Sequence, residues 1–337
     1  MRYAAVLVSI AMLLAMLLSL CTGPSFDHGV VLTLGFPTGQ ILHLRLVRLA
    51  AAAIVGASLS LSGILLQNLL RNPLADPYVL GLSGGASLAI MVWIFLIGLE
   101  SQAVHLLPWE SDVLGMGHTA PAFLGAAGAA ACCFWLGRRT RTGSMDPVRM
   151  ILAGVIISTI TGALMILINS FLPAYQQNHV YFYLFGYISE ITPAWLLLVG
   201  ALGLAGAWGG GLFMARTLNI ASLSDIEAAS LGVSMQKTRL INFLLSSALT
   251  AISVAIAGPI GFVGLICPHI SRRLVGPDHR RLLVIAPLIG ATLLVLADLL
   301  ARISATWLNH PVPVGVITAL IGGPLFLYMM RNTTGWR

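Results

Sequence analysis

Residues 47–70 read VRLAAAAIVGASLSLSGILLQNLL. This stretch contains one charged side chain, that of Arg48, and it is long enough to cross the apolar core of a bilayer as a helix. Further apolar runs lie on either side of it, separated by polar or Gly/Pro-rich breaks. The sequence therefore predicts about ten transmembrane helices, over residues 3–22, 47–70, 83–99, 120–137, 149–171, 193–214, 239–257, 259–271, 282–301 and 313–330. The eighth is short and rich in Gly and Pro, which makes it a candidate pathway-lining or contact element.

The composition excludes a soluble fold. Of the 337 residues, 58% are hydrophobic and only 9% are charged, whereas soluble domains carry about 25% charged residues. A soluble core could not bury so much apolar surface, but a bilayer is itself an apolar solvent. We therefore expect an all-α membrane protein with one transmembrane domain over residues 1–337, in which residues 1–44 form the first helix and an outside loop.

The basic residues orient these helices. If the amino terminus lies in the cytoplasm and the chain alternates sides, fifteen of the eighteen Arg and Lys residues fall on the cytoplasmic side. The positive-inside rule requires this bias, which explains the formal net charge of +7 without a nucleic-acid partner. The exceptions are Arg45, Arg48 and Arg302. The sequence predicts an even number of spans with both termini in the cytoplasm.

Motifs for bond chemistry are missing from the sequence. It has no GxxxxGK[ST] phosphate loop and no HExxH. The main acidic residue within a predicted span, Asp298, precedes Arg302 by four residues, so we expect an ion pair along one helix face and not a proton relay. Gln67 and Asn68 lie late in an apolar helix, where we expect them to hydrogen-bond between helices, with pathway lining as the alternative.

The predicted cytoplasmic loop 215–238 contains the sequence SDIEAASLG at residues 224–232. Ser224 or Asp225 at its start, Glu227 near the first turn and Gly232 at its end are typical of a short capped helix. The segment is too polar to span a membrane. On the opposite side, residues 172–190 are rich in aromatic side chains, which suits either an interfacial belt or a mouth that contacts substrate or a partner.

Several stretches, in order along the chain, resemble one known family. They are RLVR (45–48), SGILLQNLLRNPLADPYVLGLSGGA (62–86), RMILAG (149–154), DIEAASLG (225–232), AGPIGFVGLICPHISRRLVGPDHR (257–280), ADLLAR (297–302) and PVGVITALIGGPLFLY (313–328). The region 45–328 resembles the FecCD-type permeases, which are membrane subunits of type II ABC importers for iron-siderophores, haem and corrinoids. Val47 stands where the family usually has Pro.

The resemblance implies a homodimer of ten-helix subunits with a translocation path on the twofold axis, in the cytoplasmic membrane of a bacterium or archaeon. The expected partners are membrane lipid, two ATP-binding subunits and a periplasmic or lipid-anchored substrate-binding protein, but no nucleic acid. ATP and Mg would bind to the partner subunits, so no cofactor is expected on this chain and no enzyme activity of its own.

The resemblance also assigns three groups of residues. The cytoplasmic segment that couples to the ATPase would include Leu223, Ser224, Asp225, Glu227, Ala228, Ala229, Leu231 and Gly232. Docking of the binding protein would use Arg45, Arg48 and Arg302. The pathway or gate residues would be Gln67, Asn72, Pro73, Met145, Asp146, Pro147 and Val148.

The sequence does not determine the identity of the cargo. An iron-siderophore, haem, a corrinoid or an oxyanion such as molybdate all fit, because selectivity in such importers lies mainly in the binding protein. Two other classes compete with the importer. An ion-gradient carrier would depend on Asp298, and an intramembrane enzyme would have only Cys267, His269 and Asp298 available, which lack nucleophile or metal spacing.

Overall fold

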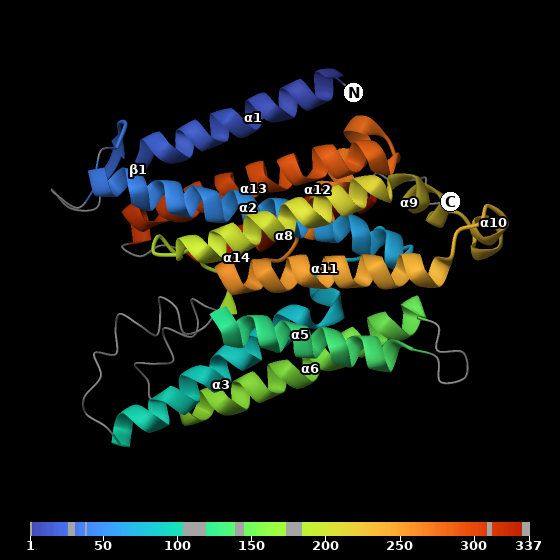
Figure 1. The fold of residues 1–337 in the computed structure, drawn as a ribbon. Coiled ribbons are helices and arrows are strands. Elements are labelled where there is room, and N and C mark those ends of the chain that lie inside the picture. Colours follow the sequence, from blue (N-terminus) through green and yellow to red (C-terminus); the bar gives the residue numbers. More distant parts are fainter. Residues whose placement is uncertain are drawn as a thin grey trace.

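The computed structural model describes residues 2–25, 31–37, 39–103, 119–138, 145–172, 184–308 and 312–331. These residues form twelve α-helices, one 3-10 helix and one two-stranded sheet (Figure 1). The α-helices are α1 (Arg2–Cys21), α2 (Gly39–Leu70), α3 (Leu82–Ala103), α5 (Thr119–Gly137), α6 (Pro147–Phe171), α8 (Ala194–Phe213), α9 (Ala215–Ala221), α10 (Asp225–Ser230), α11 (Met235–Ala257), α12 (Val263–Val275), α13 (His279–Leu308) and α14 (Val314–Arg331). The 3-10 helix η1 is Pro77–Leu80.

The α-helical fold class is confirmed, and each predicted range overlaps a helix. Within the described residues, six helices are long and apolar enough to cross a membrane, namely α2, α5, α6, α8, α11 and α13. Shorter apolar stretches lie in α1, α3 and α14. The number of ten spans stays a prediction.

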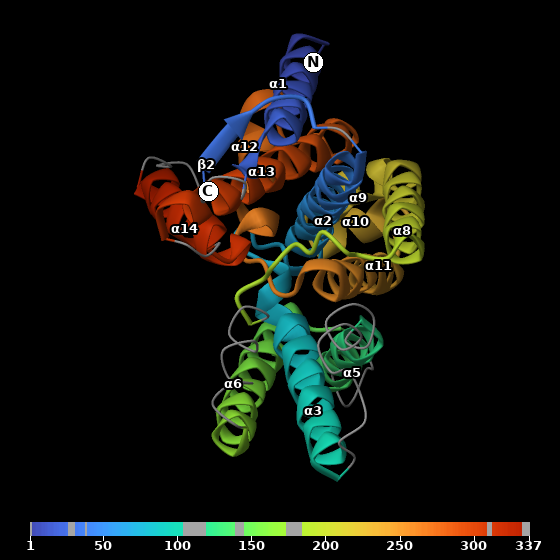
Figure 2. The same ribbon diagram turned by 90° about the vertical axis from the view of Figure 1, so that its left-hand side faces the viewer.

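Helix α2 is the centre of the larger group of helices. Of the residues in its apolar window, 83% are buried, because α1, α8, α11, α12 and α13 pack around it (Figure 2). Glycines permit the closest approaches, since a side chain at Gly56 would collide with the backbone of Gly290 in α13, and one at Gly63 with Gly264 in α12. Small residues at contact points let membrane helices pack at short distance.

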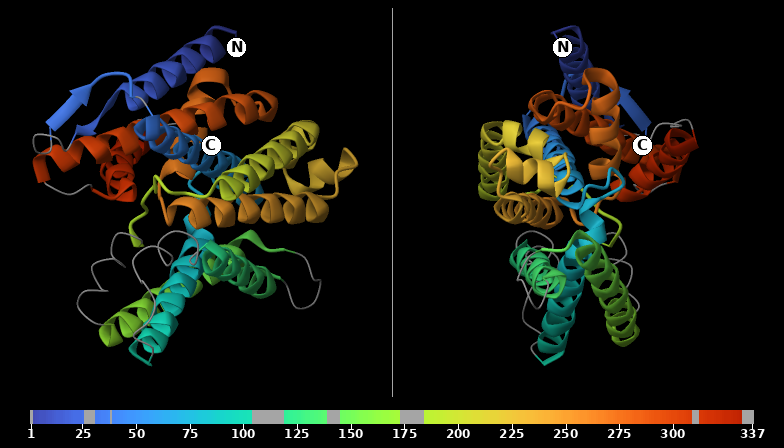
Figure 3. Two further views of the ribbon diagram at one scale, coloured as in Figure 1. Left: turned by 60° about the vertical axis from the view of Figure 1, so that its left-hand side comes forward. Right: turned by 90° about the vertical axis from the view of Figure 1, so that its right-hand side faces the viewer.

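Helices α3, α5 and α6 form a second group, which lies on one side of the α2-centred group in every view (Figures 2 and 3). Gly85 of α3 and Gly125 of α5 meet backbone to backbone, and α5 also packs against α11. Only 17% of the apolar window of α6 is buried. Helix α6 therefore presents a long apolar face that no described part of this chain covers.

Several predicted boundaries are wrong, and the following bear on the candidate site. Helix α2 begins at Gly39 and not at residue 47, and α13 continues to Leu308 and not to residue 301, so Arg45 and Arg302 lie within helices. Internal partners for these guanidinium groups, described below, allow the helices to continue. Helix α12 begins at Val263, four residues later than predicted. The predicted outside loop contains the antiparallel strands β1 (Thr22–Ser25) and β2 (Val31–Leu34).

Candidate functional site

Helix α10 is a short helix with reciprocal caps at its start. The Ser224 hydroxyl accepts a hydrogen bond from the Glu227 backbone N–H at 3.2 Å, and the Glu227 carboxylate accepts one from the Ser224 backbone N–H at 2.9 Å. These bonds form a capping box, which satisfies donors that a helix start leaves free. The Ser224 hydroxyl also donates to the Glu227 carboxylate at 2.7 Å, and this bond, together with the one from the Ser224 backbone N–H, lowers the pKa of Glu227 from its ordinary value. Gly232 ends the helix with a φ of 77°. The predicted capped helix is confirmed.

Ion pairs attach α10 to the ends of two long helices. The Asp225 carboxylate lies 2.8 Å from a guanidinium nitrogen of Arg71, which follows α2, and 3.1 Å from one of Arg239 in α11. Arg71 has a φ of 47° and also donates to the carbonyl of Ala221 at 3.1 Å. Two arginines on one carboxylate hold α10 as a firm projection at this end of the bundle (Figure 1).

The outer surface of α10 is apolar at three exposed side chains, those of Leu223, Ile226 and Leu231. Ile226 is 83% exposed and was not among the residues predicted for coupling. The sequence signal for Ile226 is an apolar side chain within an otherwise polar segment. Ala228 was predicted to be part of the docking surface but is fully buried, because the helix turns it toward the bundle.

The predicted gate residues 145–148 lie at the start of α6. Asp146 caps this helix by accepting the backbone N–H of Val148 at 3.0 Å, and Pro147 occupies the first turn, where its missing N–H costs nothing. The carbonyl of Met145 accepts a hydrogen bond from Arg239 at 3.4 Å. Residues 139–144, which precede this segment, lie outside the described residues. Because Arg239 also pairs with Asp225, it contacts both the gate segment and α10.

Gln67 and the segment after α2 pack against the start of α12. The Gln67 amide donates to the carbonyls of Ala75 and Gly264, at 3.2 and 3.3 Å. Asp76 accepts the backbone N–H of Tyr78 at 2.9 Å, and it also accepts backbone hydrogen bonds from Phe262, which directly precedes α12, and from Leu265 in its first turn. Asp76 thus caps two helix starts. An Asp directly before a Pro is typical of a helix start, and this signal for the cap of η1 was missed in the sequence.

The remaining predicted pathway residues follow α2 directly. The Asn72 side-chain oxygen accepts the backbone N–H of Leu74 at 2.9 Å, and the Asn72 N–H donates to the carbonyl of Gln67 at 3.2 Å. Pro73 lies in the same turn and is partly exposed. Asn72 and Pro73 therefore form a tight turn that begins the chain's path to η1.

Asn68 is the hub of a buried polar cluster that joins four helices. Its amide donates to the carbonyl of Leu218 in α9 at 2.9 Å, its oxygen accepts the amide of Asn242 in α11 at 2.9 Å, and it lies 3.3 Å from His279 in α13. Buried amides in membrane proteins must find such partners. The prediction that Gln67 and Asn68 bond between helices is confirmed.

At the opposite end of the molecule, Asp298 lies between two arginines. Arg48 contacts it at 2.8 Å and Arg302 at 3.3 Å, and Arg48 also contacts Glu190 at 3.0 Å. Tyr187 stacks beneath Arg48, with 5.4 Å between the guanidinium carbon and the ring centre. We call Arg48, Glu190, Asp298 and Arg302 the outer charge cluster. It confirms the predicted pair of Asp298 and Arg302.

The outer charge cluster places two of the three predicted docking arginines inside the protein. Arg48 and Arg302 are 4% and 5% exposed, and Arg302 also donates to the carbonyls of Ser19 and Thr22. Arg45 is partly exposed and donates to the carbonyl of Leu20 at 2.6 Å. The side chain of Glu190 is 44% exposed. Arg45 and Glu190 are therefore the members of this region that reach the surface.

Comparison with known proteins agrees with this architecture. The FecCD transport family matches residues 7–332. The ABC transporter permease protein YvrB of Bacillus subtilis is 38% identical over 312 residues, which cover 89% of this chain and 81% of that protein. The hemin transport system permease protein HmuU of Yersinia pestis is 37% identical, with 86% and 82% covered.

One solved structure covers nearly the whole chain. It is an inward-facing ABC transporter assigned to the metal-chelate type, with a TM-score of 0.80 and 30% sequence identity over 98% of this chain and 99% of that one. The predicted resemblance is therefore confirmed, and the chain belongs to the FecCD transport family.

Proposed function

We propose that this chain is the membrane-spanning permease subunit of an ATP-driven ABC importer, which moves a metal chelate into the cytoplasm. One observation carries the proposal beyond family membership. Helix α10 is capped, exposed and apolar at its outer surface, and Arg239 connects it to the start of α6. A site of this kind can receive a mechanical input at one end of the bundle and pass it to a long helix.

We propose that the input comes from two ATP-binding subunits, one docked on the α10 of each copy of this chain. Leu223, Ile226 and Leu231 supply apolar contact, and the Glu227 carboxylate fixes the helix start. ATP and Mg belong to those partners, so this chain carries no step of bond chemistry. Its task is to convert the movement of the docked subunits into a change of helix positions.

The transmission runs through side chains that are already in contact. A displacement of α10 moves Asp225, which is bound to Arg71 and Arg239. Arg239 in turn holds the carbonyl of Met145. Since Met145 directly precedes the cap of α6, a shift of Arg239 changes where α6 begins. Met145, Asp146, Pro147 and Val148 are therefore proposed as the inner gate.

A homodimer with ten spans per subunit and both termini in the cytoplasm is part of the proposal. Helix α1 begins on the side of the molecule where α10 projects (Figure 1). The uncovered apolar face of α6, which includes Val155, Ile160 and Leu167, is suited to a second copy. The two α6 helices would then flank the path on the twofold axis, near the turn of Asn72 and Pro73.

The substrate-binding protein docks at the end that carries the outer charge cluster. Three arginines and two carboxylates in this region leave one positive charge in excess, counting Arg45 with the cluster. Arg45 is proposed to contact a carboxylate of that protein directly. Arg48 and Arg302 are proposed to supply positive potential and to hold Glu190 and the helix ends beneath the contact surface.

The cargo is a metal chelate such as an iron-siderophore, haem or a corrinoid. Support comes from relatives named for hemin, cobalamin and iron(3+)-hydroxamate import, and from the metal-chelate type of the solved structure. An oxyanion is the second candidate. An ion-gradient carrier has less support, because Asp298 is already paired with two arginines in the described structure.

Reconstitution tests the proposal. The chain is placed in liposomes with the ATP-binding and substrate-binding proteins encoded beside it, and uptake of ferric siderophores, haem, cobalamin and molybdate is measured. We expect ATP-dependent accumulation of one metal chelate. Accumulation driven by an ion gradient without ATP, or failure to associate with any ATP-binding subunit, would overturn it.

A further inference from the structure

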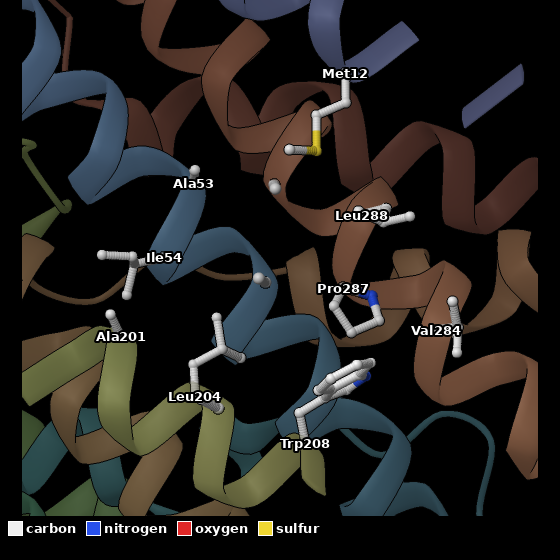
Figure 4. A pocket seen from close by; sticks show the side chains of 12 residues that line it. Met12, Ala53, Ile54, Ala201, Leu204, Trp208, Val284, Pro287 and Leu288 are labelled. Atoms are coloured by element: carbon white, nitrogen blue, oxygen red, sulfur yellow. The ribbon is translucent and has the colours of Figure 1, made fainter. Parts of the chain in front are cut away.

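Helices α1, α2, α8 and α13 enclose an apolar groove of about 420 Å³ that is open on one side (Figure 4). Met12 of α1, Ile54 of α2 and Leu288 of α13 form three of its walls. Leu204 and Trp208 of α8 form the fourth, and Trp208 is 40% exposed. Three of these four helices, α2, α8 and α13, have the apolar length of membrane spans. The open side of the groove therefore faces the bilayer or a neighbour within it.

A proline of α13 lines this groove, and the backbone carbonyl that it leaves without a helical donor has another partner. Pro287 has no N–H, so the carbonyl of Leu283, four residues earlier, lacks its helical donor. The indole N–H of Trp208 donates to that carbonyl at 2.9 Å. The walls are thereby apolar, and water inside the groove would find no partner. An apolar chain is the occupant that these walls favour.

Basic side chains stand at one end of the groove. Arg280 is exposed and lies one helical turn before Val284, a lining residue of α13. Arg216 is exposed at the start of α9, which packs against α13. Neither makes an ion pair with a described residue, whereas the neighbouring Arg281 is paired with Asp278 at 3.6 Å. Free guanidinium groups beside an apolar groove suit an anionic headgroup.

The length of the groove fits one leaflet. From Arg280 to Ala291, the last lining residue of α13, eleven residues of helix rise about 16 Å. One half of a bilayer's hydrocarbon core is about 15 Å thick. The end with Arg280 is also the end at which most basic residues of the chain lie, as expected for the cytoplasmic side.

We propose that this groove is a binding site for one anionic phospholipid of the cytoplasmic leaflet. One acyl chain lies between α1, α8 and α13, and the headgroup phosphate contacts Arg280 and Arg216. The site is independent of the translocation path, and it ties the peripheral α1 to α8 and α13 through the lipid.

Native mass spectrometry of the full-length chain, extracted from bacterial membranes in mild detergent, tests the site. Phosphatidylglycerol and phosphatidylcholine are added as probes. We expect one phosphatidylglycerol to be retained by the unaltered chain. The variant Ala205→Phe fills the groove from an exposed position of α8 and should lower retention at least fivefold, whereas Leu202→Phe, at an exposed position of α8 that does not line the groove, should not.

The headgroup is tested separately. Arg280→Gln should reduce the preference for phosphatidylglycerol over phosphatidylcholine several-fold, and Arg273→Gln, an equal loss of charge at an exposed position of α12, should leave it unchanged. Equal lipid retention by Ala205→Phe and the unaltered chain would overturn the proposal. So would cross-linking of an Ala205→Cys variant to a second chain in native membranes, because another protein would then cover the groove.

Discussion

The guanidinium of Arg239 donates to both carboxylate oxygens of Asp225, at 3.1 and 3.2 Å. The same group donates to the carbonyl of Met145, so one side chain of α11 contacts both the exposed helix α10 and the segment that begins α6. Asp225 and Arg239 are fourteen residues apart, whereas Met145 is ninety-four residues from Arg239. Arg239 therefore links α10 to the proposed gate through direct contacts.

Replacing Arg239 with Gln should uncouple ATP hydrolysis from uptake. Gln cannot contact both Asp225 and Met145 with charge-assisted bonds, while Arg71 still holds Asp225 and keeps α10 in place. In reconstituted transporters we expect ATP hydrolysis within twofold of normal and at least a fivefold loss of uptake. Lys237→Gln removes an equal charge at an exposed position nearby and serves as the control. Unaltered uptake in Arg239→Gln would show that the gate moves by another route.

Glu227→Arg should also uncouple transport, by destroying the capping box and by placing a positive charge in the helix start, where the helix dipole disfavours it. Glu227→Gln keeps a capping side chain and should retain most uptake. The assay is the ratio of cargo taken up to ATP hydrolysed. Normal coupling in Glu227→Arg would remove the assignment of α10 to the ATPase contact.

The same carboxylate predicts a pH dependence. Hydrogen bonds from Ser224 lower the pKa of Glu227 below its ordinary value of 4.5. A lowered pKa means that the cap contributes stability above the unfolded pKa and loses it as pH falls through the folded one. Coupling should therefore be unchanged between about pH 6 and 8 as far as this group is concerned. Glu227→Gln should show the same flat pH profile. The prediction would be contradicted if coupling in the unaltered chain fell within this pH range and the fall were absent in Glu227→Gln.

Local patterns in the sequence predicted the parts of the site that depend on local contacts. The capping of α10 by Ser224 and Glu227 follows from a three-residue spacing, and the pair of Asp298 and Arg302 from a four-residue spacing. Gln67 and Asn68 were predicted to bond between helices because membrane interiors leave amides no other partner. In these cases the needed information lies within one turn of helix or in the residue type itself.

Contacts between distant parts of the chain were not predictable in this way. Arg48 and Asp298 are 250 residues apart, and nothing in either segment indicates that they meet. The sequence therefore suggested exposed arginines where the structure has buried ones. The capping of α12 by Asp76 was missed for the same reason, since it requires the segment after α2 to lie against a helix start almost two hundred residues later.

Removing the Asp298 carboxylate should destabilise the fold strongly. Arg48 and Arg302 would remain buried without their shared counter-ion, and breaking a buried pair costs about 3–5 kcal/mol. We expect Asp298→Asn to lower the thermal midpoint of the purified chain in detergent. The double variant Arg48→Gln with Asp298→Asn should recover part of this loss, because it removes the positive charge of Arg48 together with the carboxylate that neutralised it. No recovery would mean that the two residues act independently.

Arg45→Glu is expected to slow docking of the substrate-binding protein while leaving the chain folded. Arg45 reaches the surface, and its one described hydrogen bond goes to a backbone carbonyl, so reversing its charge breaks no buried ion pair. Charges at the rim of an interface act mainly on the association rate, and salt screens them. The association rate should therefore fall several-fold at low ionic strength and approach that of the unaltered chain as salt is added. Arg273→Glu makes the same charge change at the opposite end of the molecule and should leave the rate unaltered. If both variants bind alike, the positive charge at this end has no part in docking, and Glu190 would become the first residue to examine there.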